Sequence, residues 1–122
     1  MAIIDKPSDY FNTKLYTGNG STQSFTGVGF QPDLIWVKSR SNTEPHIWTD
    51  VVRGANKNIR SNATSSEFTD ANNITSFDSD GFSVGTGGAV NENTYTFASW
   101  NWKAGTSFTN DASATGIGSI DS

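Results

Sequence analysis

Few residues in this chain could carry nucleophilic chemistry. There is no cysteine, and the one histidine, His46, follows Pro45 at the start of a predicted strand. A catalytic triad or dyad needs an activated nucleophile held against its base. A histidine that opens a strand behind a proline more commonly sits at an exposed or edge position. We therefore expect no catalytic role for His46.

The carboxylates offer a second kind of chemistry. A glycosidase needs two of them flanking a sugar, one with a raised pKa. Most of the twelve acidic residues instead stand beside Gly, Ser or Asn, where carboxylates cap turns. Turn capping accounts for them without catalysis, so we expect no enzymatic activity. A pair that converges only in the folded chain stays open as an alternative.

The run Asp78-Ser79-Asp80-Gly81 partly matches a calcium loop, because oxygens two residues apart can face one ion. The EF-hand pattern also requires a glutamate six residues after the glycine, and that position is Gly87. A hairpin turn with Gly81 in the left-handed conformation is the favoured interpretation. Calcium bound by Asp78 and Asp80 remains the alternative, and we expect no metal or cofactor.

Four tryptophans, Trp36, Trp48, Trp100 and Trp102, could stack on sugar rings, because the C–H face of a sugar packs on a π-system. Each indole also buries a large apolar area, and a small domain usually places such side chains in its core. Core packing is therefore the favoured interpretation, with a host-surface glycan as a possible ligand.

Charge excludes one class of partner. Charged residues make up 16% of the chain, the net charge is −4, and the eight basic residues are scattered. Nucleic-acid binding needs clustered Lys and Arg, so we expect none. The turn from Arg53 to Lys57 could contact an anionic partner, but a solvated corner, or an arginine packed across the fold, explains it better.

No stretch approaches the roughly 20 apolar residues of a membrane span, so membrane insertion is not expected. The apolar run from Ala2 to Ile4 is too short for a signal peptide and is interrupted by Asp5. We therefore expect synthesis in the cytoplasm, without export by a visible signal.

The stretch from Leu15 to Lys38 organises the rest of the chain. A strand at residues 11–17, glycines at 18 and 20 and a returning strand at 23–26 predict a β-hairpin. Gly27 and Gly29 predict a bend. Residues 33–40 then predict a central strand, because Leu34 to Val37 are apolar on both faces.

The remaining elements are short. Strands are predicted at residues 46–52, around Ile59, and at 74–77, 82–84 and 95–103, with loops at 41–45, 63–73 and 85–93. Alternation in the last strand puts Tyr95, Phe97, Ser99 and Asn101 on one face and Thr96, Ala98, Trp100 and Trp102 on the other.

About eight short strands and no confident helix predict an all-β fold, an antiparallel β-sandwich or jelly roll with extended N- and C-terminal arms. The predicted organisation is an N-terminal arm at residues 1–10, a β-sandwich domain at 11–104 and a C-terminal linker or arm at 105–122.

Several long motifs stand out in the chain. They lie at residues 1–13, 15–40 (LYTGNGSTQSFTGVGFQPDLIWVKSR), 52–57 (VRGANK), 75–85 (TSFDSDGFSVG) and 95–105 (YTFASWNWKAG). On these motifs the chain resembles a domain of tail-fibre-like and other virion structural proteins of tailed bacteriophages, many of which infect marine bacteria. The pattern is also similar to concanavalin-like β-sandwiches, at the level of fold.

The resemblance implies a structural role in the virion, as a tail-fibre or tail-appendage domain that attaches to the particle and assembles, perhaps as a trimer. A capsid decoration (cement) protein and a carbohydrate-binding host-recognition module are the alternatives. The implied partners are other virion proteins and copies of the same chain. The apolar residues of the arms are the expected interface, namely Ile3, Ile4, Tyr10, Phe108, Ile117 and Ile120. For Ile3 and Ile4, cover of the domain's own sheet edge is an equal alternative.

Overall fold

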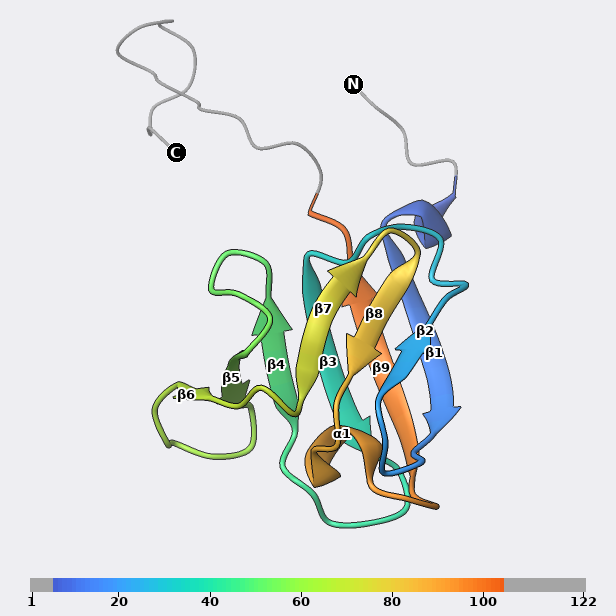
Figure 1. The fold of residues 1–122 in the computed structure, drawn as a ribbon. Helices are drawn as coiled ribbons and strands as arrows, with labels where there is room; N and C mark the ends of the chain where they lie inside the picture. The colour runs from blue at the N-terminus through green and yellow to red at the C-terminus, as the bar shows by residue number, and fades with distance from the viewer. Residues whose placement is uncertain (1–5, 105–122) are drawn as a thin grey trace, which may run out of the picture.

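The computed structural model describes residues 6–104, which form two antiparallel β-sheets packed as a sandwich (Figure 1). This confirms the predicted all-β class. The elements, in chain order, are η1 (Pro7–Asp9), β1 (Phe11–Thr17), β2 (Gln23–Phe25), β3 (Leu34–Ser39), β4 (Ile47–Asp50), β5 (Lys57–Arg60), β6 (Phe68–Thr69), β7 (Ile74–Asp78), β8 (Gly81–Val84), α1 (Gly88–Asn91) and β9 (Thr96–Trp102).

The larger sheet has six strands in the order β1-β9-β3-β4-β5-β6, and the smaller has three in the order β2-β8-β7. The first and last strands of the described chain are therefore neighbours, with β9 paired to β1 on one side and to β3 on the other. In Figure 1 the small sheet lies in front of the large one, and both ends of the described chain leave at the same end of the sandwich.

The core lies between the sheets and is built from alternate residues of each strand. In β3 the burial alternates, so that Ile35 and Val37 face inward while Leu34 and Trp36 face outward. The prediction that β3 is central is confirmed. The buried core consists of Phe25, Ile35, Val37, Ile47, Ile74, Phe82, Val84, Val90 and Phe97.

The predicted hairpin between residues 11–17 and 23–26 is wrong, although both strands exist. β1 pairs with β9 in the large sheet, whereas β2 pairs with β8 in the small sheet, so the link between them crosses the sandwich. The turn glycines serve this crossing: Gly20 has φ +69° and its N–H donates to the carbonyl of Asn91. A local turn signal therefore marked a chain reversal but not a strand pair.

Asn91 fixes this crossing at the end of α1. Its side chain is fully buried, and its amide N–H groups donate to the carbonyls of Ser21 and Gly85 and to the side chain of Asn19. Its amide oxygen accepts hydrogen bonds from Asn19 N and Gln23 Nε2. A buried amide satisfied in this way holds three separate segments together.

The hairpin of β7 and β8 is confirmed, but the reason given for its glycine is wrong. Within residues 6–104 the glycines with positive φ are Gly20, Gly27, Gly29 and Gly54, and Gly81 is not among them. A Cβ atom at position 81 would lie 1.9 Å from the carbonyl oxygen of Phe25. Glycine is needed there because the backbone of β2 approaches closely.

Three smaller differences concern short elements. The predicted loop at 63–73 contains β6, which pairs with β5, and the predicted loop at 85–93 contains the single turn α1. The predicted strand at 46–52 ends earlier, because Val51 and Val52 lie in the turn after β4. The elements β6 and α1 contain two and four residues, too few to leave a periodic signal.

The close approach at Gly81 yields a stability prediction. We expect Gly81→Ala to lower the free energy of unfolding by at least about 2 kcal/mol, because β2 must move away from β8. Gly88→Ala is the matched control, since its nearest contact is the mobile carboxylate of Glu92 at 3.1 Å. It should change stability by less than about 1 kcal/mol. Urea unfolding of both variants is the measurement, and equal stabilities would contradict the argument.

Candidate functional site

The outer face of the large sheet carries all four tryptophans in aligned rows. In the central row the strand register places Thr13, Trp100, Trp36, Trp48 and Ile59 side by side across β1, β9, β3, β4 and β5. The next row contains Phe11, Trp102, Leu34 and Asp50. A third row contains Leu15, Ala98 and Lys38. We call these three rows the aromatic face.

The rings of this face contact one another in a continuous chain. Trp100 and Trp36 have ring centroids 4.8 Å apart, and Trp36 and Trp48 are 5.7 Å apart. Trp48 and Trp102 are 6.4 Å apart, and Trp102 packs on Phe11 at 5.1 Å. Cross-strand aromatic pairs of this kind stabilise a sheet by roughly 0.2–1 kcal/mol each. The same rings also present a broad apolar surface.

The prediction that the tryptophans form the core is wrong. None of the four belongs to the buried cluster, and all are half-buried on the outside of the sheet. Around them Leu15 is 56% exposed, and Phe11 and Ile59 are also exposed. The two-face division predicted for β9 is confirmed, but the face that points inward carries Phe97, Ser99 and Asn101.

An apolar hollow of about 750 Å³ borders the face where β3 begins and β4 ends. Val52 on its rim is 91% exposed. The lining residues are Asp33, Leu34, Trp48, Asp50, Val51, Val52, Arg53 and Ala104.

Arg53 lines this hollow, and its guanidinium is engaged in contacts within the protein. Its guanidinium pairs with Asp50 at 2.6 Å and with Glu67 at 3.2 Å, and it also donates to the carbonyl of Trp48. Partial burial by itself would raise the pKa of Asp50, but the hydrogen bonds from the main chain and side chain of Arg53 outweigh it and lower that pKa. The arginine thus stabilises the turn after β4 by contacts within the protein.

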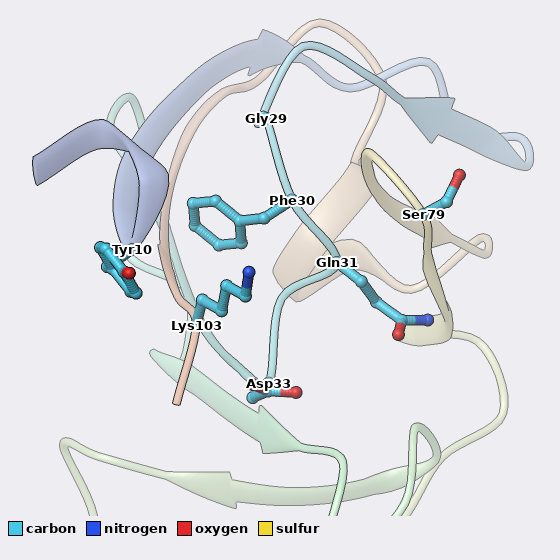
Figure 2. Close-up of a pocket in the computed structure, with 7 residues that line it drawn as sticks. All are labelled: Tyr10, Gly29, Phe30, Gln31, Asp33, Ser79 and Lys103. Atoms are coloured by element: carbon cyan, nitrogen blue, oxygen red, sulfur yellow. The ribbon is translucent and has the colours of Figure 1, made fainter. Parts of the chain in front are cut away.

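A second, more polar hollow of about 730 Å³ lies at the end where the described chain begins and stops. Figure 2 shows the Lys103 side chain reaching into it beside Phe30, with Tyr10 on one side and Gln31 on the other. The Lys103 ammonium lies 5.8 Å from the centre of the Tyr10 ring. The hollow is lined by Tyr10, Gly29, Phe30, Gln31, Asp33, Ser79 and Lys103.

Two of the polar side chains that line this end hollow already make hydrogen bonds within the protein. Gln31 Nε2 donates to the carbonyl of Phe77, and one oxygen of Asp33 accepts the N–H of Ala104. What remains is one ammonium, one carboxylate oxygen, one amide oxygen and the hydroxyls of Tyr10 and Ser79. This set can hydrogen-bond a polar ligand, but it does not pair a nucleophile with a base.

The carboxylates of the suspected calcium loop are occupied by the protein itself. The two oxygens of Asp80 accept the N–H groups of Gly27 and Gly29, and those of Asp78 accept the hydroxyls of Ser76 and Ser83. Within residues 6–104 no three His, Cys, Asp or Glu side chains gather closely enough to hold a metal. Through its two hydrogen bonds, Asp80 in the β7–β8 turn holds the loop of residues 27–29 in place.

His46 lies at the edge of the aromatic face, with its ring 6.5 Å from that of Trp36. Its main-chain N–H is bonded to the side chain of Asn62. It borders a small hollow of about 420 Å³ together with Lys38 and Glu44. Its side chain is half-buried directly before β4, an inner strand of the large sheet, so the expected exposed or edge position is not found.

Most of the predicted interface residues lie outside the part of the chain that the structure describes. Tyr10 is 44% exposed and closes η1. Ile3, Ile4, Phe108, Ile117 and Ile120 lie outside the described residues. Sequence reasoning did not single out Phe11, Leu15 and Ile59 as surface residues. The alternation of Phe11, Thr13 and Leu15 along β1 could have indicated one face, but not that this face points outward.

The bonds to Asp80 predict a pH effect. Main-chain donation from Gly27, then from Gly29, lowers the pKa of Asp80. The stability that it contributes is therefore complete above the unfolded-state value of about 3.9 and is lost as the pH falls through the lower folded-state value. We expect carboxyl NMR titration to place Asp80 below the unfolded value. Asp80→Asn should remove this part of the acid sensitivity, and an unchanged acid profile would contradict the role of the carboxylate.

Comparison with known proteins gives one match. No curated protein and no solved structure matches the chain significantly. No helix within residues 6–104 is long and apolar enough to cross a membrane. The sequence pattern of the family described as Domain of unknown function (DUF7483) matches residues 6–122, which includes the whole described sandwich. The chain therefore belongs to the DUF7483 family.

Proposed function

We propose that this domain is a non-enzymatic structural module of a tailed-bacteriophage virion. Its role there is that of a tail-fibre or tail-appendage domain that attaches to the particle and assembles with copies of itself. It is made in the cytoplasm of the host bacterium and resides in the virion. The resemblance of its motifs to tail-fibre-like proteins supports the setting, and the aromatic face supports the mode of action.

The observation that carries the proposal is the aromatic face itself. Its central row, from Thr13 across three indoles to Ile59, contains no charged side chain. The cores of protein interfaces are likewise depleted of charge and enriched in tryptophan and other aromatics. A contiguous apolar surface of this kind on a small domain marks a docking site.

The geometry favours docking to protein over catalysis. Of the charged residues in the three rows, Asp50 pairs with Arg53 and Lys38 Nζ donates to the carbonyl of Ser39. The polar hollow at the end of the sandwich lacks a base held against a nucleophile. A capsid decoration protein would use the same face, and only the position in the particle separates it from a tail appendage.

Location in the particle is the direct test. Purified virions labelled with an antibody against the domain should show it at the tail by electron microscopy. A position on the capsid would select the decoration role, and absence from purified virions would overturn the proposal as a whole.

A pair of charge insertions tests the surface. Thr13→Lys and Trp100→Lys add the same charge to neighbouring positions of the central row. The central position of Trp100 would bury its charge in the interface, at a cost of several kcal/mol, whereas Thr13 lies on the outermost strand. We expect incorporation of Trp100→Lys into particles to fall by more than about tenfold, with Thr13→Lys close to wild type. Circular dichroism confirms folding, and equal incorporation would argue against docking at this face.

Glycan binding is the second candidate, favoured by the same half-exposed indoles. The rings are tilted by 36° between Trp36 and Trp100 and by 44° between Trp36 and Trp48, so they form a ridged surface. Sugar stacking needs an open ring face, which ridged, mutually packed indoles offer only in part. Protein docking therefore remains the leading proposal.

A glycan array with the folded domain tests this candidate. If it is right, Trp100→Ala should abolish the signal while Tyr10→Ala, in the end hollow, leaves it unchanged. Loss only in Tyr10→Ala would move the site to the end hollow. No signal from the wild-type domain would reject glycan binding.

A further inference from the structure

Strand β1 forms an open edge of the large sheet. Figure 1 shows it at one side of the sandwich, and among residues 6–104 its only strand partner is β9. An edge strand presents a row of N–H and C=O groups that form a template for another strand, and natural domains commonly shorten, charge or cover such edges. β1 is instead seven residues long, and Lys14 is its one charged residue.

The hydrogen bonds of β1 show which of its groups face the open edge. The even-numbered residues from 10 to 14 direct their carbonyls toward β9, where each accepts a hydrogen bond. Main-chain groups of successive residues point to alternate sides, so those of Phe11, Thr13 and Leu15 point to the open edge. The N–H of Thr13 accordingly donates to the side chain of Asn12 and not to β9. The next carbonyl at this edge, that of Thr17, already accepts a side-chain hydrogen bond from β2.

The side chains at these positions favour contact with another protein surface. Phe11 is 38% and Leu15 is 56% exposed, and with Thr13 between them they form the outermost part of the aromatic face. Lys14 points to the opposite side of the sheet, where its Nζ would lie 3.9 Å from a Cβ atom at Gly27. The ammonium therefore extends toward the small sheet, and the outer side of this edge carries no charge.

The sequence of β1 is complementary to itself in one antiparallel register. With Thr13 opposite Thr13 of a second copy, Phe11 lies opposite Leu15 and Asn12 lies opposite Lys14. A Thr–Thr pair across two strands is favourable, and Phe11 beside Leu15 buries two exposed apolar side chains. Each of the three outward-pointing residues can then exchange main-chain hydrogen bonds with the second copy.

The neighbouring registers are less favourable. Moving the axis by one residue, to Lys14, places two ammonium groups opposite each other, and like charges in that position destabilise the pair. Moving it further, to Leu15, requires the carbonyl of Thr17, which β2 already occupies. Moving it the other way, to Asn12, leaves fewer residues with main-chain bonds to the second copy. The register centred on Thr13 is therefore the most favourable.

We propose that the β1 edges of two copies of this chain pair in this register and join two six-stranded sheets into one. The two-fold axis passes between the two Thr13 residues and is perpendicular to the sheet, so the two aromatic faces lie on the same side. A further protein then meets a surface with two sets of indoles. This inference deepens the self-assembly proposed above and rests on it for its role in the particle. The two fail separately, because the pairing is measured on the purified chain and the role in virions.

Cysteine cross-linking tests the register. The chain contains no cysteine, and Thr13→Cys places two thiols on the axis with Cα atoms about 5.5 Å apart, which suits a disulfide. Lys14→Cys and Leu15→Cys are the matched controls, because each meets its own copy only if the axis moves to its position. After mild oxidation we expect at least about tenfold more linked dimer from Thr13→Cys than from either control. Equal cross-linking of all three, or more from a control, would overturn the proposal.

Sedimentation equilibrium of the full chain tests the pairing in solution, where we expect a dimer. Thr13→Pro removes an N–H that makes no bond to β9, so the strand survives while the dissociation constant rises by more than about tenfold. Thr17→Pro, on the same edge but outside the paired residues, should leave it unchanged, with circular dichroism as the check on folding. Thr13→Lys keeps the main-chain bonds and should weaken the pairing by less than about fivefold.

Three results of the sedimentation experiment would overturn the proposal. The first is a wild-type chain that remains monomeric at about 1 mM. The second is a trimer, because pairing of two identical edges about a two-fold axis closes as a dimer. The third is an equal dissociation constant for Thr13→Pro and Thr17→Pro, which would place the contact away from this part of β1.

Discussion

The register of β9 between β1 and β3 determines which residues this domain buries and which it displays. Successive side chains of a strand point to opposite faces, so a slip of one residue would exchange the two sets. Two inward residues of β9 hold the register through side-chain bonds: Ser99 Oγ donates to the carbonyl of Lys14, and Asn101 Nδ2 donates to that of Asn12. Both side chains are fully buried, and a slip would expose them and force the indoles into the core. The polar residues of β9 thus specify the arrangement that leaves Trp100 and Trp102 outside.

The prediction from sequence succeeded where the signal was local. The bounds of β1, the central place of β3, the β7–β8 hairpin and the two faces of β9 all follow from alternation and turn residues. The pairing of β1 with β9 could not be predicted, because it joins residues such as Phe11 and Trp102 that are far apart in the chain. The glycines at 18 and 20 gave a strong hairpin signal, yet what they permit is the approach of the crossing loop to Asn91.

The misplaced tryptophans show the same limit for the candidate site. Size and hydrophobicity favoured a core position, but the space between the sheets is already filled by Phe25, Phe82 and Phe97 with their aliphatic neighbours. Alternation in β9 set Trp100 and Trp102 apart from Phe97, and it could not say which set faced the second sheet. That choice depends on how the small sheet covers the large one, which is a property of the whole fold. The sequence therefore indicated which residues of β9 share a face, but it could not indicate that this face forms an exposed surface.

Hydrogen bonds close the two ends of the sandwich, whereas the aromatic face stays uncovered. At one end the amide of Asn91 joins the crossing loop, the end of β8 and α1. At the other end Asp80 ties down the bend at Gly27 and Gly29, and Lys103 N donates to the carbonyl of Tyr10. Backbone bonds of this kind fix loops without consuming apolar surface, so they leave the indoles and their neighbours uncovered. The four tryptophans on this outer sheet face are therefore the feature on which the proposed docking to another surface rests.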